Sequence, residues 1–323
     1  MKILIPYCSG NAGGPTVFVT ALTQHLQNQG YKVISHFSPS FDVLLVIAEC
    51  PLLPVLCAKL LRKRIVQRLD GVYHAALPGA TKYLYPLKNL RMQIIHNFLA
   101  DHVIYQSRFS KYSCQTMLGK RTKNTSIIYN GVAAGKTLGF DRKKPRVEEA
   151  AANLVTYASF RRPDQIEPIL ESVKCLTTPY HLHIYGPHTK NLVNIFNSLK
   201  NNPHITYYGA QNHSKLLSLI PQHDIFLFSD QSACPNAVLE ALAAGLPVVA
   251  FNRGSIPELI QPGASGEIIN YPFTSQNYTQ FAQAIQKTFS NLSDYQTAAR
   301  QRARINYDVT NTCLKYEKIL RQK

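Results

Sequence analysis

The chain has 323 residues, which is long enough for two ordinary domains, each with its own hydrophobic core. A composition of 45% hydrophobic and 16% charged residues excludes an intrinsically disordered protein, and no apolar run approaches the roughly 18 residues of a membrane span. The seven cysteines are scattered and never in CxxC spacing, so they predict neither a disulfide framework nor a zinc site. A reducing compartment, the cytoplasm, is therefore expected.

The net charge of +17 is concentrated in the first part of the chain. Residues 1–140 carry 16 Lys and Arg against four Asp and Glu, whereas residues 141–323 carry 19 against 14. Basic segments at residues 59–64 and 81–93, the second also aromatic, are typical of a protein that lies on an anionic membrane. Nucleic-acid binding is the competing explanation, but no nucleic-acid-binding module is recognisable and no such partner is expected. The charge favours peripheral attachment to the inner face of the membrane, with a basic, solvated surface that binds no partner as the alternative.

Strand-like and helix-like segments alternate through the first 130 residues. Strands are expected at residues 2–7, 32–37, 42–48, 64–69, 102–107 and 125–130, and a first helix from about Pro15 to Gln29. The loop "CSGNAGGPTVF" places Gly13 and Gly14 where a ligand could approach the backbone at a helix N-terminus. A plain tight turn explains the same residues equally well.

A second alternation follows residues 131–152, a charged, Gly-bearing stretch that is expected to connect two domains. Its strands are expected at residues 154–159, 181–186, 204–209, 224–229 and 246–251, and helical patterns dominate from Ser275. The sequence thus predicts two doubly wound parallel sheets in series. Ligands of such sheets bind outside the carboxyl ends of the strands. The candidate ligand loops are therefore those after Tyr7, Ser159, Gly186, Gly209 and Ser229.

The run "CPNAVLEALAAGLPVVAF" predicts a helix that could bind an anion. Pro235 suits a first helical position, and the first-turn amides with the helix dipole form an anion site. Glu240 lies about one turn further along, where it could accept hydrogen bonds from the hydroxyls of a phosphorylated sugar. The competing interpretation is a solvated or salt-bridged glutamate on a helix whose leucines form the core.

With residues 224–260 as its main support, the sequence resembles the retaining glycosyltransferases of family 4, also called group 1, which have the GT-B fold. The segments "GGPTVFVTAL", "VQRLDGVYH", "ADHVIYQSRFSK" and "IIYNGV" resemble that family in the same order, so the resemblance covers nearly the whole chain. It implies two α/β Rossmann-like domains that face a central cleft. Residues 1–140 would form the acceptor-side domain, 141–305 the donor domain, and 306–323 a helix packing back on the first domain.

The resemblance also implies a reaction and a site. A sugar would pass with retention, and without a metal or other cofactor, from a nucleotide-diphosphate sugar to a glycan or lipid-linked acceptor. Glu240 would hold the ribose hydroxyls, and the amides of residues 236–238 the diphosphate. The candidate catalytic residues are Asp70, Ser232 and Glu240, and the candidate donor-binding residues are Gly13, Gly14, Ser159, Arg161, Arg162, Gly186, Pro187, Gly209, Asn236, Ala237, Val238 and Glu240. Asp70, in "RLDG", could instead cap a turn with Gly71.

The sequence departs from the family pattern at three positions. The first glutamate of the donor-site pattern falls on Ser232, with Asp230 as the nearest replacement. The phosphate-binding Arg and Lys of the family align with Ser159 and Asp164, so Arg161 and Arg162 are the candidate substitutes. These departures leave an alternative open, a nucleotide-sugar or glycan-binding protein that retains the fold with weakened catalysis.

Overall fold

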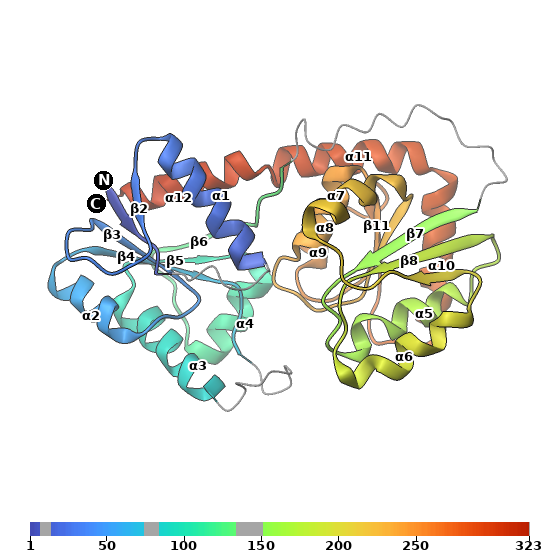
Figure 1. Cartoon of the computed structure of the whole chain (residues 1–323), viewed down its shortest axis with the longest axis horizontal. Coiled ribbons are helices and arrows are strands. Elements are labelled where there is room, and N and C mark those ends of the chain that lie inside the picture. Colours follow the sequence, from blue (N-terminus) through green and yellow to red (C-terminus); the bar gives the residue numbers. More distant parts are fainter. Residues whose placement is uncertain (7–13, 74–83, 134–150, 323) are drawn as a thin grey trace. The chain divides into compact units, whose positions relative to one another are not determined.

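The computed structural model describes residues 1–6, 14–73, 84–133 and 151–322, and the chain divides into two compact units (Figure 1). Unit 1 comprises Met1–Gly131 and Val309–Lys323, and unit 2 comprises Val132–Asp308. The domain boundary expected at residue 140 lies outside the described residues. Across the four described ranges, every helix is too short or too polar to cross a membrane.

Unit 1 is built on a six-stranded parallel sheet in the order β2-β1-β3-β4-β5-β6. Its strands are β1 (Lys2–Leu4), β2 (Lys32–Ile34), β3 (Val43–Ile47), β4 (Arg64–Leu69), β5 (His102–Tyr105) and β6 (Thr125–Ile127). The helices between them are α1 (Gly14–Asn28), α2 (Leu52–Leu60), α3 (Tyr85–Ile94), the π-helical turn η2 (Ile95–Leu99) and α4 (Arg108–Leu118). All six strands fall within the segments predicted from the sequence.

The last helix of the chain, α12 (Val309–Arg321), belongs to unit 1. Its buried Tyr316 packs against Phe18 of α1, with ring centroids 4.8 Å apart. Glu317 of the same helix accepts hydrogen bonds from His25 (3.0 Å) and from the hydroxyl of Tyr31 (2.9 Å). The end of the sequence thus completes the core of the unit that the beginning forms.

Unit 2 contains a second six-stranded parallel sheet, in the order β12-β11-β10-β7-β8-β9. Its strands are β7 (Ala152–Tyr157), β8 (Tyr180–Tyr185), β9 (Ile205–Tyr207), β10 (Ile225–Phe228), β11 (Val248–Phe251) and β12 (Gly266–Ile269). Its helices are α5 (Glu167–Val173), α6 (Val193–Ser198), α7 (His213–Leu219), α8 (Asn236–Ala244), α9 (Ile256–Leu259), α10 (Ser275–Ser290) and α11 (Leu292–Asn306). Strand β12 is absent from the sequence-based prediction, because its sequence, Gly-Glu-Ile-Ile, does not form an apolar run.

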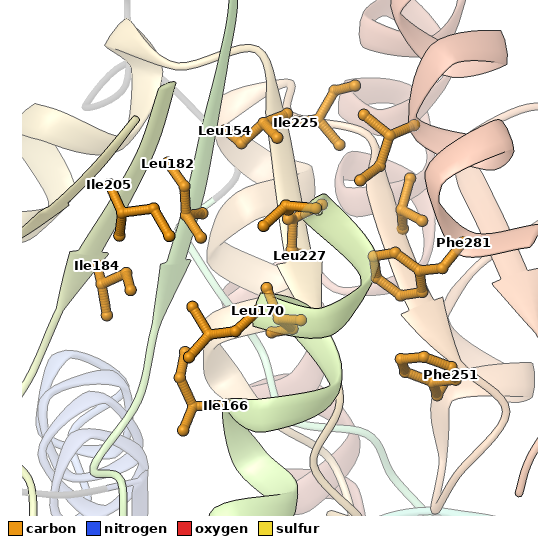
Figure 2. Packing of buried hydrophobic residues seen from close by; sticks show 14 of the residues in the cluster. Leu154, Ile166, Leu170, Leu182, Ile184, Ile205, Ile225, Leu227, Phe251 and Phe281 are labelled. Atoms are coloured by element: carbon orange, nitrogen blue, oxygen red, sulfur yellow. The ribbon is translucent and has the colours of Figure 1, made fainter. Parts of the chain in front are cut away.

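One face of this sheet is covered by α5, α6 and α10 around a single hydrophobic core (Figure 2). Alternate residues of the strands point into it, such as Leu182 and Ile184 of β8 and Leu227 of β10. Phe281 of α10 stacks on Phe251 at a centroid distance of 4.7 Å. Since the strands are parallel and in register, for example Tyr157 opposite Tyr185, their carboxyl ends share one edge of the sheet.

Candidate functional site

The candidate site lies at the carboxyl edge of the unit 2 sheet, where the strand order reverses. From the central strand β7 the chain proceeds outward through β8 and β9, and then returns to pair β10 on the other side of β7. The carboxyl ends of β7 and β10 therefore form the topological switch point of the sheet, the place at which doubly wound sheets bind ligands. Ser159 lies exposed in the first of these loops and Ser232 half-buried in the second.

Backbone hydrogen bonds join the loops after β7, β8 and β9. The amide of Phe160 donates to the carbonyl of Pro187 (2.9 Å), and the amide of Gly186 donates to the carbonyl of Gly209 (2.7 Å). Gly186 has φ +120°, and a Cβ there would lie 1.9 Å from the carbonyl oxygen of Ala158. Gly209 has φ +68°, but a Cβ there would meet no atom within 4 Å. Gly186 thus holds two loops together, whereas Gly209 has open space beside it.

These two glycines predict different costs for the same substitution. Gly186→Ala should destabilise the protein by about 1–3 kcal/mol for the steric overlap with Ala158, in addition to about 1–2 kcal/mol for the positive φ. Gly209→Ala should cost only the second amount. Urea unfolding of both variants measures the difference, and equal losses of unfolding free energy would contradict the close approach at Gly186.

Helix α8 begins at the end of the loop after β10, on the same edge of the sheet. Pro235 is the residue before the helix, with φ −69° and ψ 118°, so the prediction that it occupies the first helical position was wrong by one residue. The fixed φ of proline is compatible with both a helical and an extended residue, and the extended ψ of Pro235 shows that it lies before the helix. The amide of Val238 donates to the carbonyl of Pro235 (3.1 Å). The amides of Asn236 and Ala237 precede it in the first turn.

Glu240 is a buried carboxylate with only 7% of its surface exposed. Its Oε2 accepts a hydrogen bond from the hydroxyl of Tyr157 at the end of β7 (3.2 Å). Its Oε1 lies 2.9 Å from Nε2 of His213, the first residue of α7. The Tyr157 hydroxyl also lies 2.9 Å from the carbonyl of Ala237. The Glu240 side chain is thus held from two sides. Its burial excludes a solvated glutamate, whereas its ion pair with His213 agrees with the competing interpretation of a salt-bridged glutamate on a helix whose leucines form the core.

The pKa values of both partners of Glu240 are raised. The hydrogen bond to Glu240 raises the pKa of His213 above its usual 6.5, against the opposing effect of burial. Burial, together with the Glu240 charge, raises the pKa of Tyr157 well above 10. The His213–Glu240 pair therefore stabilises unit 2 fully below about pH 6.5, and this contribution is lost as the pH rises through the raised pKa.

Replacing Glu240 should reverse the shift at His213. In Glu240→Gln the His213 pKa is expected to fall to or below 6.5, because burial, which lowers it, is then no longer opposed by a carboxylate. NMR titration of the imidazole signals measures this change. His102 of unit 1, whose pKa is lowered by burial, is the internal reference and should not move. An unchanged His213 pKa would contradict the ion pair.

Four charged side chains form a network across the loops after β7, β10 and β11. Arg162 contacts Asp230 (2.7 Å) and Asp164 (2.9 Å), and Arg253 contacts Asp164 (2.9 Å). Arg253 also donates to the carbonyl of Ser229 (2.9 Å). Burial raises the pKa of Asp164, but hydrogen bonds from both arginines outweigh it and lower the pKa below its usual value. Two positive and two negative charges balance, so the network fixes the loops and adds no net charge.

The two arginines predicted as phosphate-binding substitutes have different surroundings. Arg162 is engaged by Asp164 and Asp230. Arg161 is exposed, and among the described residues its guanidinium has no hydrogen bond or ion pair. Ser232, at the position of the missing glutamate, donates to Asp230 Oδ2 (3.3 Å). Only Arg161 of this pair therefore has a charge that is not already neutralised.

The remaining candidates, Asp70, Gly13 and Gly14, belong to the sequence of unit 1. Asp70 is half-buried and lies directly after β4. Burial, together with the smaller effect of the Asp70 charge, raises the pKa of the Cys114 thiol to about 12. Gly14 is the first residue of α1, and Gly13 lies outside the described residues.

Sequence reasoning missed three residues of the unit 2 site: Tyr157, His213 and Arg253. Tyr157 was read only as part of a strand, although an aromatic hydroxyl at a strand end needs a polar partner when it is buried. His213 follows Asn212, which caps α7 by accepting from the Ser214 amide (3.0 Å), and this Asn could have marked the helix start. Arg253 lies two residues after the end of β11, and its place near a strand end was its only signal.

Comparison with known proteins agrees with this geometry. Residues 139–305 match the family of the glycosyl transferases group 1. The chain belongs to this family. Among curated relatives of the chain, N-acetyl-alpha-D-glucosaminyl L-malate synthase of Bacillus anthracis is 22% identical over 158 residues, 46% of this chain and 41% of the relative. The chain spans less than half the length of the curated relatives it matches.

Solved structures of similar fold cover nearly the whole chain. HepE of Anabaena in complex with UDP has a TM-score of 0.75 at 15% identity, covering 99% of each chain. Sucrose-phosphate synthase from Thermosynechococcus elongatus has a TM-score of 0.79 at 14% identity, covering 99% of this chain and 98% of that one. The fold class is thus GT-B, with two Rossmann-like α/β units, as the sequence predicts.

Proposed function

We propose that this glycosyltransferase moves a sugar from a nucleotide-diphosphate sugar to a glycan or lipid-linked acceptor, with retention and without a metal or other cofactor. The observation that carries the proposal is the position of Glu240, a buried carboxylate about one turn beyond the first amides of α8. Those amides and the helix dipole suit a diphosphate, and the carboxylate beyond them suits the hydroxyls of a ribose. Tyr157 and His213 hold the carboxylate in place.

In a retaining transfer of this type, positioning and electrostatics supply most of the rate. The acceptor hydroxyl attacks the face of the sugar from which the diphosphate leaves, and a diphosphate oxygen takes its proton. Negative charge grows on the leaving diphosphate, and Arg161 is the available cation in the loop after β7 to stabilise it. Asp230, fixed by Arg162 and Ser232, is assigned the contact with the donor sugar that the family makes from the position of Ser232.

The charge balance around Arg162 supports a second candidate function. Because Asp164 and Asp230 neutralise Arg162, and Asp164 also engages Arg253, the site offers a leaving diphosphate fewer available cations. A nucleotide-sugar or glycan-binding protein with weakened catalysis would retain the same fold and the same Glu240. Binding without turnover is the property that distinguishes it.

A donor panel tests the proposal. Solved structures of HepE contain UDP and UDP-glucose, so UDP-sugars are the first donors to assay, followed by GDP- and ADP-sugars. At least one donor should raise the melting temperature and be hydrolysed slowly to the nucleoside diphosphate. Stabilisation without hydrolysis or transfer would favour the binding protein. Failure of every donor at millimolar concentration would overturn both candidates.

The proposed acceptor side is unit 1, in the cytoplasm at the inner face of the membrane. Its sequence carries the larger share of the positive charge, which anionic lipids or an anionic glycan would attract. Lys59, one of the basic residues expected to face the lipid, is engaged by Asp101 at 2.7 Å. Arg64 is half-buried, and burial lowers its pKa. The membrane contact therefore needs residues other than those two.

A further inference from the structure

Helix α2 of unit 1 exposes leucines where a water-facing helix carries polar residues. Leu53, Leu56 and Leu60 are spaced three and four residues apart, so they share one side of the helix. Their exposed fractions are 71%, 45% and 84%. The opposite side is buried through Val55 and Ala58. Lys59 is the only charged residue of the helix, and α2 is therefore apolar on both its inner and its outer side.

The surroundings of α2 extend this apolar surface and add positive charge beside it. Phe98, 74% exposed, belongs to η2, which contacts α2. Leu61 directly after the helix is 46% exposed. Arg62 and Lys63 follow it, and residues 51–64 contain no acidic residue. We define these residues, Leu53, Leu56, Leu60, Leu61 and Phe98 with Arg62 and Lys63, as the leucine face.

We propose that the leucine face inserts into the interfacial layer of an anionic lipid bilayer. Leucine and phenylalanine side chains gain free energy by leaving water for the acyl boundary, and the adjacent Arg and Lys would lie at the level of the anionic headgroups. The absence of acidic side chains from residues 51–64 gives the charge complementarity that selects an anionic bilayer. Attachment is thus partly hydrophobic, not only electrostatic. This proposal rests on the proposed function in one respect, namely that the acceptor lies at the membrane.

The sequence contains no tryptophan, so a single introduced Trp reports its own surroundings without background. In Leu56→Trp, vesicles containing phosphatidylglycerol should shift the emission to shorter wavelength, and brominated acyl chains should quench it. Tyr112→Trp is the matched control, since Tyr112 is also in unit 1 and is 73% exposed, on α4. Its emission should change far less. Equal responses of both reporters, or no response of Leu56→Trp, would overturn the proposal.

Sedimentation with the same vesicles separates the two contributions. Arg62→Gln with Lys63→Gln should remove the salt-sensitive part of binding. The triple change of Leu53, Leu56 and Leu60 to Gln should reduce binding at least tenfold at 0.5 M salt, where the field of the charges is screened. Both variants should keep donor binding and donor hydrolysis. If the variants bind vesicles as wild type does, the membrane proposal fails and the proposed function is unaffected. If no donor binds, the proposed function fails and the membrane proposal is unaffected. A wild-type mass twice that of the triple variant by light scattering, without vesicle binding, would instead assign the leucine face to a second copy of this chain.

Discussion

Glu240→Gln is expected to weaken binding of the nucleotide-sugar donor by about 1.5–3 kcal/mol, or about ten- to a hundredfold in Kd. The change keeps the size of the side chain but removes the charge that we propose accepts hydrogen bonds from the ribose. The Tyr157 hydroxyl can still donate to the remaining amide oxygen, so the fold should persist. Isothermal titration calorimetry with the donor found by the panel measures the loss.

Glu267→Gln is the matched control for this variant. Glu267 also accepts from a tyrosine hydroxyl, that of Tyr295, and contacts a cation, Lys287, at 2.8 Å. It lies near the start of β12, away from the carboxyl edge of the sheet. Its replacement should change the melting temperature by a similar amount and leave donor affinity unchanged. Equal affinities of wild type and Glu240→Gln would remove Glu240 from the donor site.

Arg161→Ala and Arg162→Ala are expected to differ, although the residues are neighbours. Arg161→Ala should lower kcat by about a hundredfold or more, the usual cost of removing one group that stabilises charge in a transition state, with little change in melting temperature. Arg162→Ala leaves Asp230 without its cation and takes one of two cations from Asp164, so its main effect should be loss of stability.

Steady-state kinetics and thermal unfolding of both variants distinguish these roles. Arg304, an exposed arginine on α11, provides the control, because Arg304→Ala removes the same side chain outside these loops and should alter neither quantity beyond a small factor. If Arg161→Ala transfers sugar at the wild-type rate, the charge on the leaving diphosphate is stabilised by another group, and Arg253 becomes the next residue to test.

The fold follows closely from the sequence because its signals are local. Apolar runs such as "DVLLVIA" and "DIFLFS" predicted buried parallel strands, and the structure confirms β3 and β10 within them. Strand β12 was missed because it begins with Gly and Glu, so it lacks an apolar run, and half its residues are only partly buried. It is a strand because it pairs with β11 along its full length, from Val248 opposite Gly266 to Phe251 opposite Ile269. Such pairing depends on the tertiary structure, so a short segment of sequence does not predict it.

The site is less fully predictable, because its important contacts join residues that are distant in sequence. Glu240 was found through its place in a helix after a strand, a local pattern. Its partner Tyr157 is 83 residues away, and Arg162 and Asp230 are separated by 68. The sequence alone therefore treated Arg162 as an available cation, whereas the structure shows it paired. The roles of the donor-site residues remain predictions until they are tested.

A double-mutant cycle between protein and ligand tests the central claim, that Glu240 binds the ribose of a nucleotide donor, most directly. Calorimetry compares the best-binding nucleoside diphosphate with its 2′,3′-dideoxy form, in wild type and in Glu240→Gln. Loss of the hydroxyls should cost wild type about 1.5–3 kcal/mol and cost the variant little, because the charged acceptor is already absent. Equal losses in the two proteins would show that the ribose hydroxyls do not interact with Glu240 and would contradict the assignment of the donor site.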